Sequence, residues 1–247
     1  MIALVTLDFW QTLFADTRDG LRQAHVLRLE GVRAALAEAG HLYAAAEVAS
    51  ADSRSGEVFA AVWREHRDMT AAEQLRRFLA ELDASLPSAL DGVTLDRVAG
   101  AYQDPVLAHR PETTPGAAET VHRIRGDGFK LALISNTGRT PGRVLRRLLA
   151  DAGLLPCFDV LAFSDEAGVR KPAAEIFRGV LDQTGTDPAS AAHVGDDATA
   201  DVAGARCRHA GHPLRAGRRR GGAGRRRAPA LRRPPGRCRA AGVIGRD

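Results

Sequence analysis

An aspartate stands at the end of the first apolar run of the chain. The run Ile2 to Leu7 is short, and Asp8-Phe9-Trp10-Gln11-Thr12-Leu13 follows it directly. A carboxylate placed there can act as a covalent nucleophile, and Thr12 can hydrogen-bond an oxyanion or orient the carboxylate. Taken alone, an aspartate at a strand end is more often a helix cap or a loop anchor.

Two more polar groups follow later apolar runs. Ser135-Asn136-Thr137-Gly138 offers hydroxyl, amide and backbone donors for a phosphoryl oxygen, although the same residue types favour helix N-caps. Lys171-Pro172 precedes a helical pattern, and Lys171 is one of only two lysines among 35 basic residues. A compact ammonium there can neutralise a carboxylate and an incoming phosphate together, and a solvated surface lysine is the alternative.

The last polar group is a cluster of carboxylates. Gly195-Asp196-Asp197-Ala198-Thr199-Ala200-Asp201 follows the apolar run Ala191 to Val194. Clustered carboxylates repel one another unless a cation or hydrogen bonds compensate them, and hard oxygen ligands suit Mg²⁺. The alternative is that Asp196 or Asp197 caps the next helix.

The elements that must position these groups alternate in type. Short apolar runs at Ile2 to Leu7, Leu131 to Ile134, Val160 to Phe163 and Ala191 to Val194 indicate buried parallel strands. Helical periods separate the later runs, as expected for βαβ units. We therefore predict an α/β fold with a doubly wound, Rossmann-like parallel sheet, in which ligands bind at the carboxyl ends of the strands.

Residues 15–110 have a different pattern. Several apolar faces with helical spacing follow one another there, and Thr70 and Glu73 form a possible capping box. The expected domains are an α/β core of residues 1–14 and 111–205, an inserted all-helical domain of residues 15–110, and a basic tail of residues 206–247. Arg22, Arg28, Arg33 and Arg67 in the insertion are candidates for contact with an anionic substrate, although solvated helix surface is the expected role of any one of them.

Together the four polar groups resemble the haloacid dehalogenase superfamily. That family's pattern is Asp-x-Asp-x-Thr, a strand ending in Ser or Thr, a lysine, and Gly-Asp-Asp or Gly-Asp-x-x-x-x-Asp. The resemblance covers residues 1 to about 205 and makes the helical insertion similar to the family's cap domain. In chain order, the matching residues are Asp8 and Thr12, then Ser135, then Lys171, and last Gly195 with Asp196, Asp197 and Asp201.

The resemblance implies a Mg²⁺-dependent phosphohydrolase that acts on a small phosphorylated metabolite through an aspartyl-phosphate at Asp8. Asp8, Thr12, Ser135 and Lys171 would be catalytic, and substrate would contact Trp10, Ser135, Asn136 and Lys171. Magnesium would bind Asp8, the carbonyl of Trp10 and Asp196, while Asp197 or Asp201 would hold the waters of the metal or Lys171.

Trp10 departs from the family pattern, because phosphatases of the family carry their general acid and base at that position. Loss of a positioned acid typically slows a reaction by about two to four orders of magnitude. Family members that dehalogenate 2-haloacids need no metal and carry an aromatic tyrosine there. A metal-free dehalogenase using Asp8 is therefore the alternative, and the acidic cluster favours phosphoryl chemistry over it.

Charge divides the chain into two unequal parts. Residues 206–247 hold 14 arginines and one acid, which is a net charge of +13, whereas residues 1–205 carry −8. The tail is rich in Arg, Gly, Ala and Pro and has no sustained apolar period, so we expect little packed structure in it. It predicts either a catalytically weakened, polyanion-binding module with nucleic acid as partner, or an out-of-frame translation of GC-rich DNA.

Composition narrows the class of protein further. Hydrophobic residues make up 45% of the chain and charged residues 26%, which is typical of a globular protein. The sequence shows neither a signal peptide nor a membrane span, which predicts a cytoplasmic protein without a membrane partner. Cys157, Cys207 and Cys238 have no metal-type spacing, so neither a zinc site nor a disulfide framework is expected.

Overall fold

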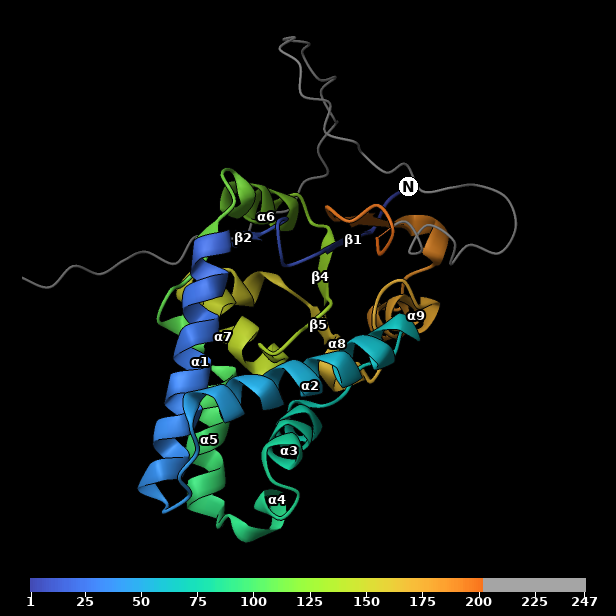
Figure 1. The fold of residues 1–247 in the computed structure, drawn as a ribbon. Coiled ribbons are helices and arrows are strands. Elements are labelled where there is room, and N and C mark those ends of the chain that lie inside the picture. The colour runs from blue at the N-terminus through green and yellow to red at the C-terminus, as the bar shows by residue number, and fades with distance from the viewer. Residues whose placement is uncertain (202–247) are drawn as a thin grey trace, which may run out of the picture. The chain divides into compact units, whose positions relative to one another are not determined.

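A four-stranded parallel sheet forms the centre of the computed structural model, which describes residues 1–201 (Figure 1). Its strands are β1 (Leu4–Leu7), β4 (Lys130–Ser135), β5 (Val160–Phe163) and β6 (Ala191–Val194). They lie in the order β5-β4-β1-β6, and every neighbouring pair is parallel. From β1 the chain first adds β4 and β5 on one side of the sheet and then adds β6 on the other side, as in a doubly wound fold. In such folds ligands bind beyond the carboxyl ends of the strands.

The register of the sheet brings the polar groups to one edge. Leu7, the last residue of β1, pairs with Leu133 in β4 and with Val194 in β6. The next residue, Asp8, donates its backbone N–H to the carbonyl oxygen of Val194 over 2.9 Å. Because parallel strands all end on the same side, the segments after β1, β4 and β6 meet at the carboxyl edge of the sheet.

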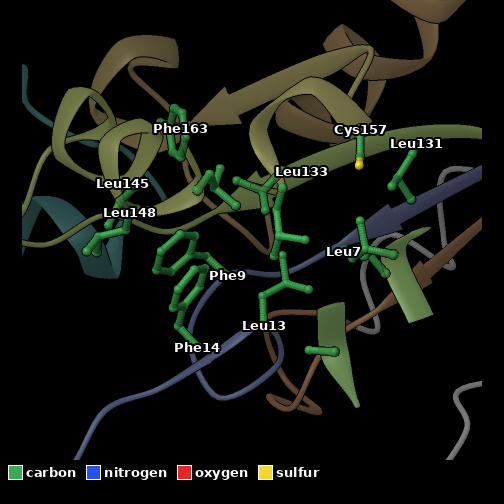
Figure 2. Packing of buried hydrophobic residues seen from close by; sticks show 14 of the residues in the cluster. Leu7, Phe9, Leu13, Phe14, Leu131, Leu133, Leu145, Leu148, Cys157 and Phe163 are labelled. Carbon is green, nitrogen blue, oxygen red and sulfur yellow. The ribbon is translucent and has the colours of Figure 1, made fainter. Parts of the chain in front are cut away.

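Helices cover both faces of the sheet, because successive residues of a buried strand point to opposite sides. In β4, Leu131 and Leu133 pack into a cluster with α7 (Gly142–Asp151), whereas Ala132 and Ile134 pack into a second cluster with α9 (Ala174–Thr184). Figure 2 shows the first cluster, in which the rings of Phe9 and Phe14 stack with their centres 4.6 Å apart. The four polar segments are therefore attached to a sheet that is buried on both faces.

Residues between β2 (Phe14–Ala15) and β3 (Glu112–Thr113) are helical, and these two short strands pair antiparallel where the segment leaves and rejoins the sheet. The five α-helices share a hydrophobic cluster of their own, with Leu36, Leu79 and Tyr102 fully or almost fully buried in it. Thr70 and Glu73 form the expected capping box. The helices are α1 (Arg18–Glu38), α2 (Ala45–Arg64), α3 (Ala71–Leu82), α4 (Leu86–Ala89) and α5 (Gly92–Gln103).

The short elements of residues 1–201 complete the chain path. They are the helices α6 (Ala117–Gly126) and α8 (Ser164–Ala167), and the 3-10 turns η1 (Pro105–Leu107), η2 (Leu155–Cys157) and η3 (Pro188–Ser190). No helix within residues 1–201 is long and apolar enough to span a bilayer. Cys157 is a free, buried thiol.

The predicted parallel α/β fold is confirmed. Two strands differ from the predicted runs at their ends, because β1 begins at Leu4 rather than Ile2 and β4 extends by one residue on each side, from Lys130 to Ser135. Helix α5 ends at Gln103, and Pro105 starts a separate 3-10 turn. A helix ends readily before proline, which has no N–H for a helical hydrogen bond. Pro172 lies two residues before the first residue of α9. Residues 202–205 of the predicted core and the tail 206–247 lie outside the described residues.

The close packing of Gly142 on β5 gives a first prediction. A Cβ atom on this first residue of α7 would lie 2.5 Å from Cδ2 of Phe163 and 2.6 Å from Oε1 of Glu166. We expect Gly142→Ala to lower the free energy of unfolding by about 1–3 kcal/mol, as overpacking in a core does. Urea unfolding followed by circular dichroism measures this.

Gly179 in α9 is the matched control, since a Cβ there meets no atom within 4 Å. Gly179→Ala should stabilise the protein by about 0.5–1 kcal/mol, because alanine loses less backbone entropy in a helix. Equal effects of the two substitutions would contradict this account of the packing.

Candidate active site

Asp8 is held at the end of β1 with one carboxylate oxygen in use. Its Oδ1 accepts the backbone N–H of Phe9 over 2.7 Å and lies 2.9 Å from Nζ of Lys171. Oδ2 accepts no hydrogen bond from residues 1–201 and is available for other chemistry. Burial raises the pKa of the Asp8 carboxyl, and the Lys171 ammonium opposes that rise.

Lys171 joins the first polar segment to the last. Its ammonium lies 2.9 Å from Asp8 and 2.7 Å from Oδ1 of Asp201, and the residue is only 3% exposed. His193 in β6 also contacts Asp201 Oδ1, over 3.0 Å from its Nε2. Burial raises the pKa of Asp201, but the contacts with His193 and Lys171 outweigh it and bring that pKa to about 2. Asp201 is therefore a stable counter-charge for Lys171.

Asn136 fixes the backbone that carries Lys171. Its Nδ2 donates to the carbonyl oxygen of Lys171 over 2.9 Å, and its Oδ1 accepts the backbone N–H of the same residue over 2.7 Å. Both ends of the amide are thus used within the protein. The structure brings Asn136 to the site, but as a positioning residue, and the predicted contact with substrate is not supported by this geometry.

Ser135 ends β4 beside Asp8 and is fully buried. Its hydroxyl has no hydrogen-bond partner among the described residues. An unpaired buried hydroxyl costs free energy, and such groups persist where a ligand satisfies them. This arrangement suits the predicted role of Ser135 as a donor to a substrate oxygen.

The acidic cluster divides into two parts. One carboxylate oxygen each of Asp8, Asp196 and Asp201 lie within 4.8 Å of one another. The Asp197 carboxylate instead accepts the backbone N–H groups of Thr199 and Ala200, over 2.7 and 3.1 Å. Asp197 therefore caps a turn, which was the alternative reading, and is not one of the three converging carboxylates. Its assignment as a metal ligand stays a prediction that this geometry does not favour.

The converging carboxylates fit a hard divalent cation. Partial burial, together with the charges of Asp201 and Asp197, raises the pKa of Asp196, which is the cost of like charges without a cation. Gly195 allows the close approach, because a Cβ there would lie 2.0 Å from Oδ2 of Asp201. Since Lys171 and His193 already occupy Asp201, Asp8 and Asp196 are the carboxylates best placed to bind the ion directly.

Thr12 and Trp10 lie in the loop between β1 and β2. Thr12 is half-buried, and its hydroxyl makes no hydrogen bond to the rest of residues 1–201. Trp10 is half-buried against the edge of the Phe9 ring, with ring centres 4.8 Å apart. The indole lines a cavity beside the site, which is compatible with the predicted contact with substrate. It has no group that could transfer a proton to a leaving group.

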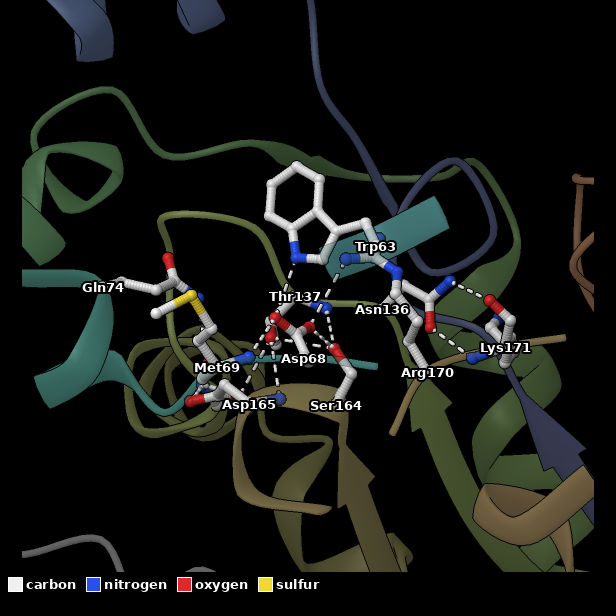
Figure 3. A network of polar contacts seen from close by, with 11 residues as sticks. Trp63, Asp68, Met69, Gln74, Asn136, Thr137, Ser164, Asp165, Arg170 and Lys171 are labelled. Carbon is white, nitrogen blue, oxygen red and sulfur yellow. Dashed lines mark hydrogen bonds and ion pairs between the residues drawn. The ribbon is translucent and has the colours of Figure 1, made fainter. Parts of the chain in front are cut away.

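A buried polar network around Thr137 was not predicted from the sequence (Figure 3). Thr137 donates its backbone N–H to Oγ of Ser164 over 2.8 Å and its hydroxyl to Asp165 over 3.0 Å. Ser164 in turn donates to Oδ2 of Asp68, which lies between α2 and α3. Burial raises the pKa of Asp165. The network ties the loop after β4 to the helical segment.

Part of this network could have been predicted, because polar residues that directly follow a parallel strand tend to lie at the carboxyl edge of the sheet. Ser164 and Asp165 follow β5 directly, in the same way that Asp8 follows β1. Asp68 gave no such signal, because only the packed structure places it next to β5. His193 was hidden inside an apolar run, where one polar residue has no distinctive pattern.

A parallel sheet with a buried carboxylate, a paired lysine and converging acids at its carboxyl edge defines an α/β enzyme with a strand-end active site. A family model for haloacid dehalogenase-like hydrolases matches residues 2–207. The chain belongs to this family of hydrolases, which confirms the resemblance seen in the four motifs.

Several curated proteins are similar to parts of the chain. The haloacid dehalogenase-like hydrolase domain-containing protein 3 of Xenopus laevis is 37% identical over 105 residues, which cover 42% of this chain and 41% of the relative. The phosphoserine phosphatase of Thermus thermophilus is 38% identical over 92 residues, covering 37% and 36%. The matches thus span about two fifths of the length of these relatives.

A solved structure resembles the chain over a longer span. The 2-haloacid dehalogenase from Pseudomonas syringae pv. Tomato aligns with a TM-score of 0.57 and 25% identity, and the alignment covers 83% of both chains. Relatives named as phosphatases and as a dehalogenase therefore both occur, and the family alone does not choose between the two reactions.

The low pKa of Asp201 predicts how stability depends on pH. A carboxyl whose pKa falls from 3.8 to about 2 on folding stabilises the protein above about pH 4, and this contribution is lost as the pH falls toward 2. The stability lost on Asp201→Asn should therefore be largest near neutral pH and shrink between about pH 4 and pH 2. Urea unfolding in chelator across this range measures it.

Asp127 provides the control, because it is exposed and its side chain has no ion pair or hydrogen bond within residues 1–201. Asp127→Asn should follow the native chain at every pH. A constant gap between the native chain and Asp201→Asn down to pH 2 would refute the assigned ion pair.

Proposed function

We propose that the chain is a Mg²⁺-dependent phosphohydrolase acting on a small phosphorylated metabolite through an aspartyl-phosphate at Asp8. The observation that carries the proposal is the convergence of Asp8, Asp196 and Asp201 within 4.8 Å beside a buried lysine. A dehalogenase that needs no metal would not require three converging carboxylates. Two relatives named as phosphatases give further support.

In this mechanism the free Oδ2 of Asp8 attacks phosphorus, and the P–O bond to the leaving group breaks. Ser135 donates its otherwise unpaired hydroxyl to a phosphoryl oxygen, and Lys171 offsets the added negative charge from its position 2.9 Å from Asp8. Thr12 is proposed to orient the Asp8 carboxylate. Water then attacks phosphorus and releases phosphate, which frees the carboxylate.

Magnesium would be held by Asp8, Asp196 and the backbone carbonyl of Trp10, and it supplies positive charge that stabilises the phosphoryl oxygens as the transition state develops. Asp201 contributes indirectly by holding Lys171 at 2.7 Å, together with its contact to His193. Asn136 maintains the backbone of Lys171 in the position that this requires.

We further propose that the helical residues 15–110 act as a cap domain over this site and select the substrate. Two polar links between helices and core support this, namely Asp68 with Ser164 and Asp52 with Arg139. The boundaries 1–14 with 111–205 for the core, and the cytoplasmic location, remain predictions. The polyanion-binding and frameshift hypotheses concern residues outside the described part of the chain.

Hydrolysis of para-nitrophenyl phosphate tests the reaction. We expect turnover with Mg²⁺ that disappears in chelator and falls about a thousand-fold or more in Asp8→Asn, since removal of a nucleophile removes the main route. Asp127→Asn should leave the rate unchanged. Turnover that persists in chelator or in the Asp8→Asn variant would contradict the proposal.

A metal-free 2-haloacid dehalogenase using Asp8 is the second candidate. The aromatic Trp10 and the structural similarity to the Pseudomonas syringae dehalogenase favour it. Halide release from 2-chloropropionate in the presence of chelator, lost in Asp8→Asn, would establish it in place of the phosphohydrolase.

Trp10 allows a gain-of-function prediction. Trp10→Asp should raise the rate on alkyl phosphates by about a hundred-fold, because a carboxylic acid can protonate a poor leaving group. The rate on para-nitrophenyl phosphate should change little, since its leaving group needs no proton. Trp10→Asn, which removes the indole without adding an acid, is the control, and an equal gain in both variants would contradict the assignment.

A further inference from the structure

A cavity of about 580 Å³ is lined in part by the two loops that follow β1 and β4, which carry Asp8 and follow Ser135. Trp10 and Gly138 line it, and these residues follow Asp8 and Ser135 by two and three positions. Its volume lies in the range of small-molecule pockets. The cavity therefore offers room for the part of a substrate that lies beyond the reacting group.

Helix α1 forms one wall of the cavity with a repeating face. Gly20, Ala24 and Arg28 all line it, and residues four apart in a helix point the same way. Glycine and alanine leave space, whereas Arg28 places a long charged side chain about 12 Å further along the helix than Gly20. The wall is thus uncharged at Gly20 and Ala24 and cationic at Arg28.

Arg28 is a buried charge without a counter-ion. The residue is 7% exposed, and its Nε donates to the carbonyl oxygen of Tyr102 over 2.8 Å. Within residues 1–201, its two terminal nitrogens form no hydrogen bond, and no carboxylate oxygen lies within 4.0 Å of the guanidinium. Burial lowers the pKa of Arg28. A desolvated guanidinium is costly unless an anion pairs with it.

The nearest carboxylate is already in use. Asp52 forms an ion pair with Arg139 over 3.0 Å, and His25 lies 3.8 Å from its other oxygen. Arg139 also donates to the hydroxyl of Tyr102 over 3.3 Å. Asp52 thus pairs directly with Arg139 and acts on Arg28 only from beyond ion-pair distance, so Arg28 has no direct counter-ion among residues 1–201.

Acidic groups also line the cavity and limit where an anion can bind. Asp19 is paired with Arg22 and with Gln23, and Glu112 is exposed. Asp16 lies two residues before α1, and burial raises the pKa of its carboxyl. Asp16 precedes α1, Asp19 lies in its first turn, and Glu112 belongs to β3. Arg28 lies near the middle of α1, away from the first turn. Arg28 is therefore the favoured position for an anion.

We propose that the substrate carries a second anionic group, a carboxylate or a second phosphate, and that Arg28 binds it in this cavity. The proposal rests on the proposed phosphohydrolase function, which places the phosphoryl group at Asp8. Arg28 pairs bidentately with a planar carboxylate or with two oxygens of a phosphate, and both provide the missing counter-charge. Alkyl phosphates, whose only anionic group is the phosphoryl group at Asp8, leave Arg28 unpaired.

The test compares phosphate esters of matched length. The native chain with Mg²⁺ is given ω-phosphooxyalkanoates of four to eight carbons, the n-alkyl phosphates of the same lengths, and the corresponding alkanediol bisphosphates. We expect a kcat/KM at least about ten-fold higher for one of the doubly anionic series than for the alkyl phosphates, because a charge-assisted pair is worth this much. The preferred series identifies the second group as carboxylate or phosphate.

Arg28→Met should remove this preference mainly by raising KM for the esters with two anionic groups, and Arg28→Lys should retain part of the preference. Arg33→Met is the matched control, because Arg33 is an exposed arginine of the same helix. Equal kcat/KM values in the native chain for matched esters with one and with two anionic groups would overturn the proposal, whether or not Arg28→Met folds.

Calorimetric binding of linear alkanedioates to the metal-free chain separates this proposal from the proposed reaction. Binding that is lost in Arg28→Met but kept in Arg33→Met, with no phosphate ester hydrolysed, would support the anion site and reject the phosphohydrolase. Hydrolysis of phosphate esters without alkanedioate binding, and without preference for esters with two anionic groups, would support the phosphohydrolase and reject the anion site at Arg28.

Discussion

The buried ammonium of Lys171 is the interaction on which the site depends. At 3% exposure it would be strongly destabilising alone, and Asp8 and Asp201 compensate it at 2.9 and 2.7 Å. Asp8 follows β1, the first strand of the sheet in the chain, and Asp201 follows β6, the last strand within residues 1–201. Displacing either segment would leave a buried charge unpaired, so the three charges hold the sheet edge in one arrangement.

Hydrogen bonds extend this constraint away from the charges. Asn136 binds both backbone polar groups of Lys171, and Thr137 binds Ser164 and Asp165 at the end of β5. Asp68 then joins the same network from the helical segment. Because these partners are buried, each depends on the others for its hydrogen bonds, and the loop after β4 is held from three sides.

Much of the candidate site was predictable because side chains that follow parallel strands meet at one edge of the sheet. Asp8, Ser135, Lys171 and Asp201 lie where the order of strands and motifs indicated. Other assignments depended on details that a one-dimensional pattern does not contain. Asn136 and Asp197 have side chains suited to ligands, yet their hydrogen bonds are used by the backbone of Lys171 and by a turn.

The sequence by itself determined the parallel α/β architecture, the helical insertion and the chemical types available at the sheet edge, because strand periods and polar strand ends are local properties. Only the tertiary structure decided which polar groups are paired and which remain free. The sequence does not distinguish among four arginines of the helical segment, namely Arg22, Arg28, Arg33 and Arg67. Packing buries Arg28 and leaves the other three exposed. Burial removes water from a charge, and it is set by residues distant in the sequence, such as Tyr102.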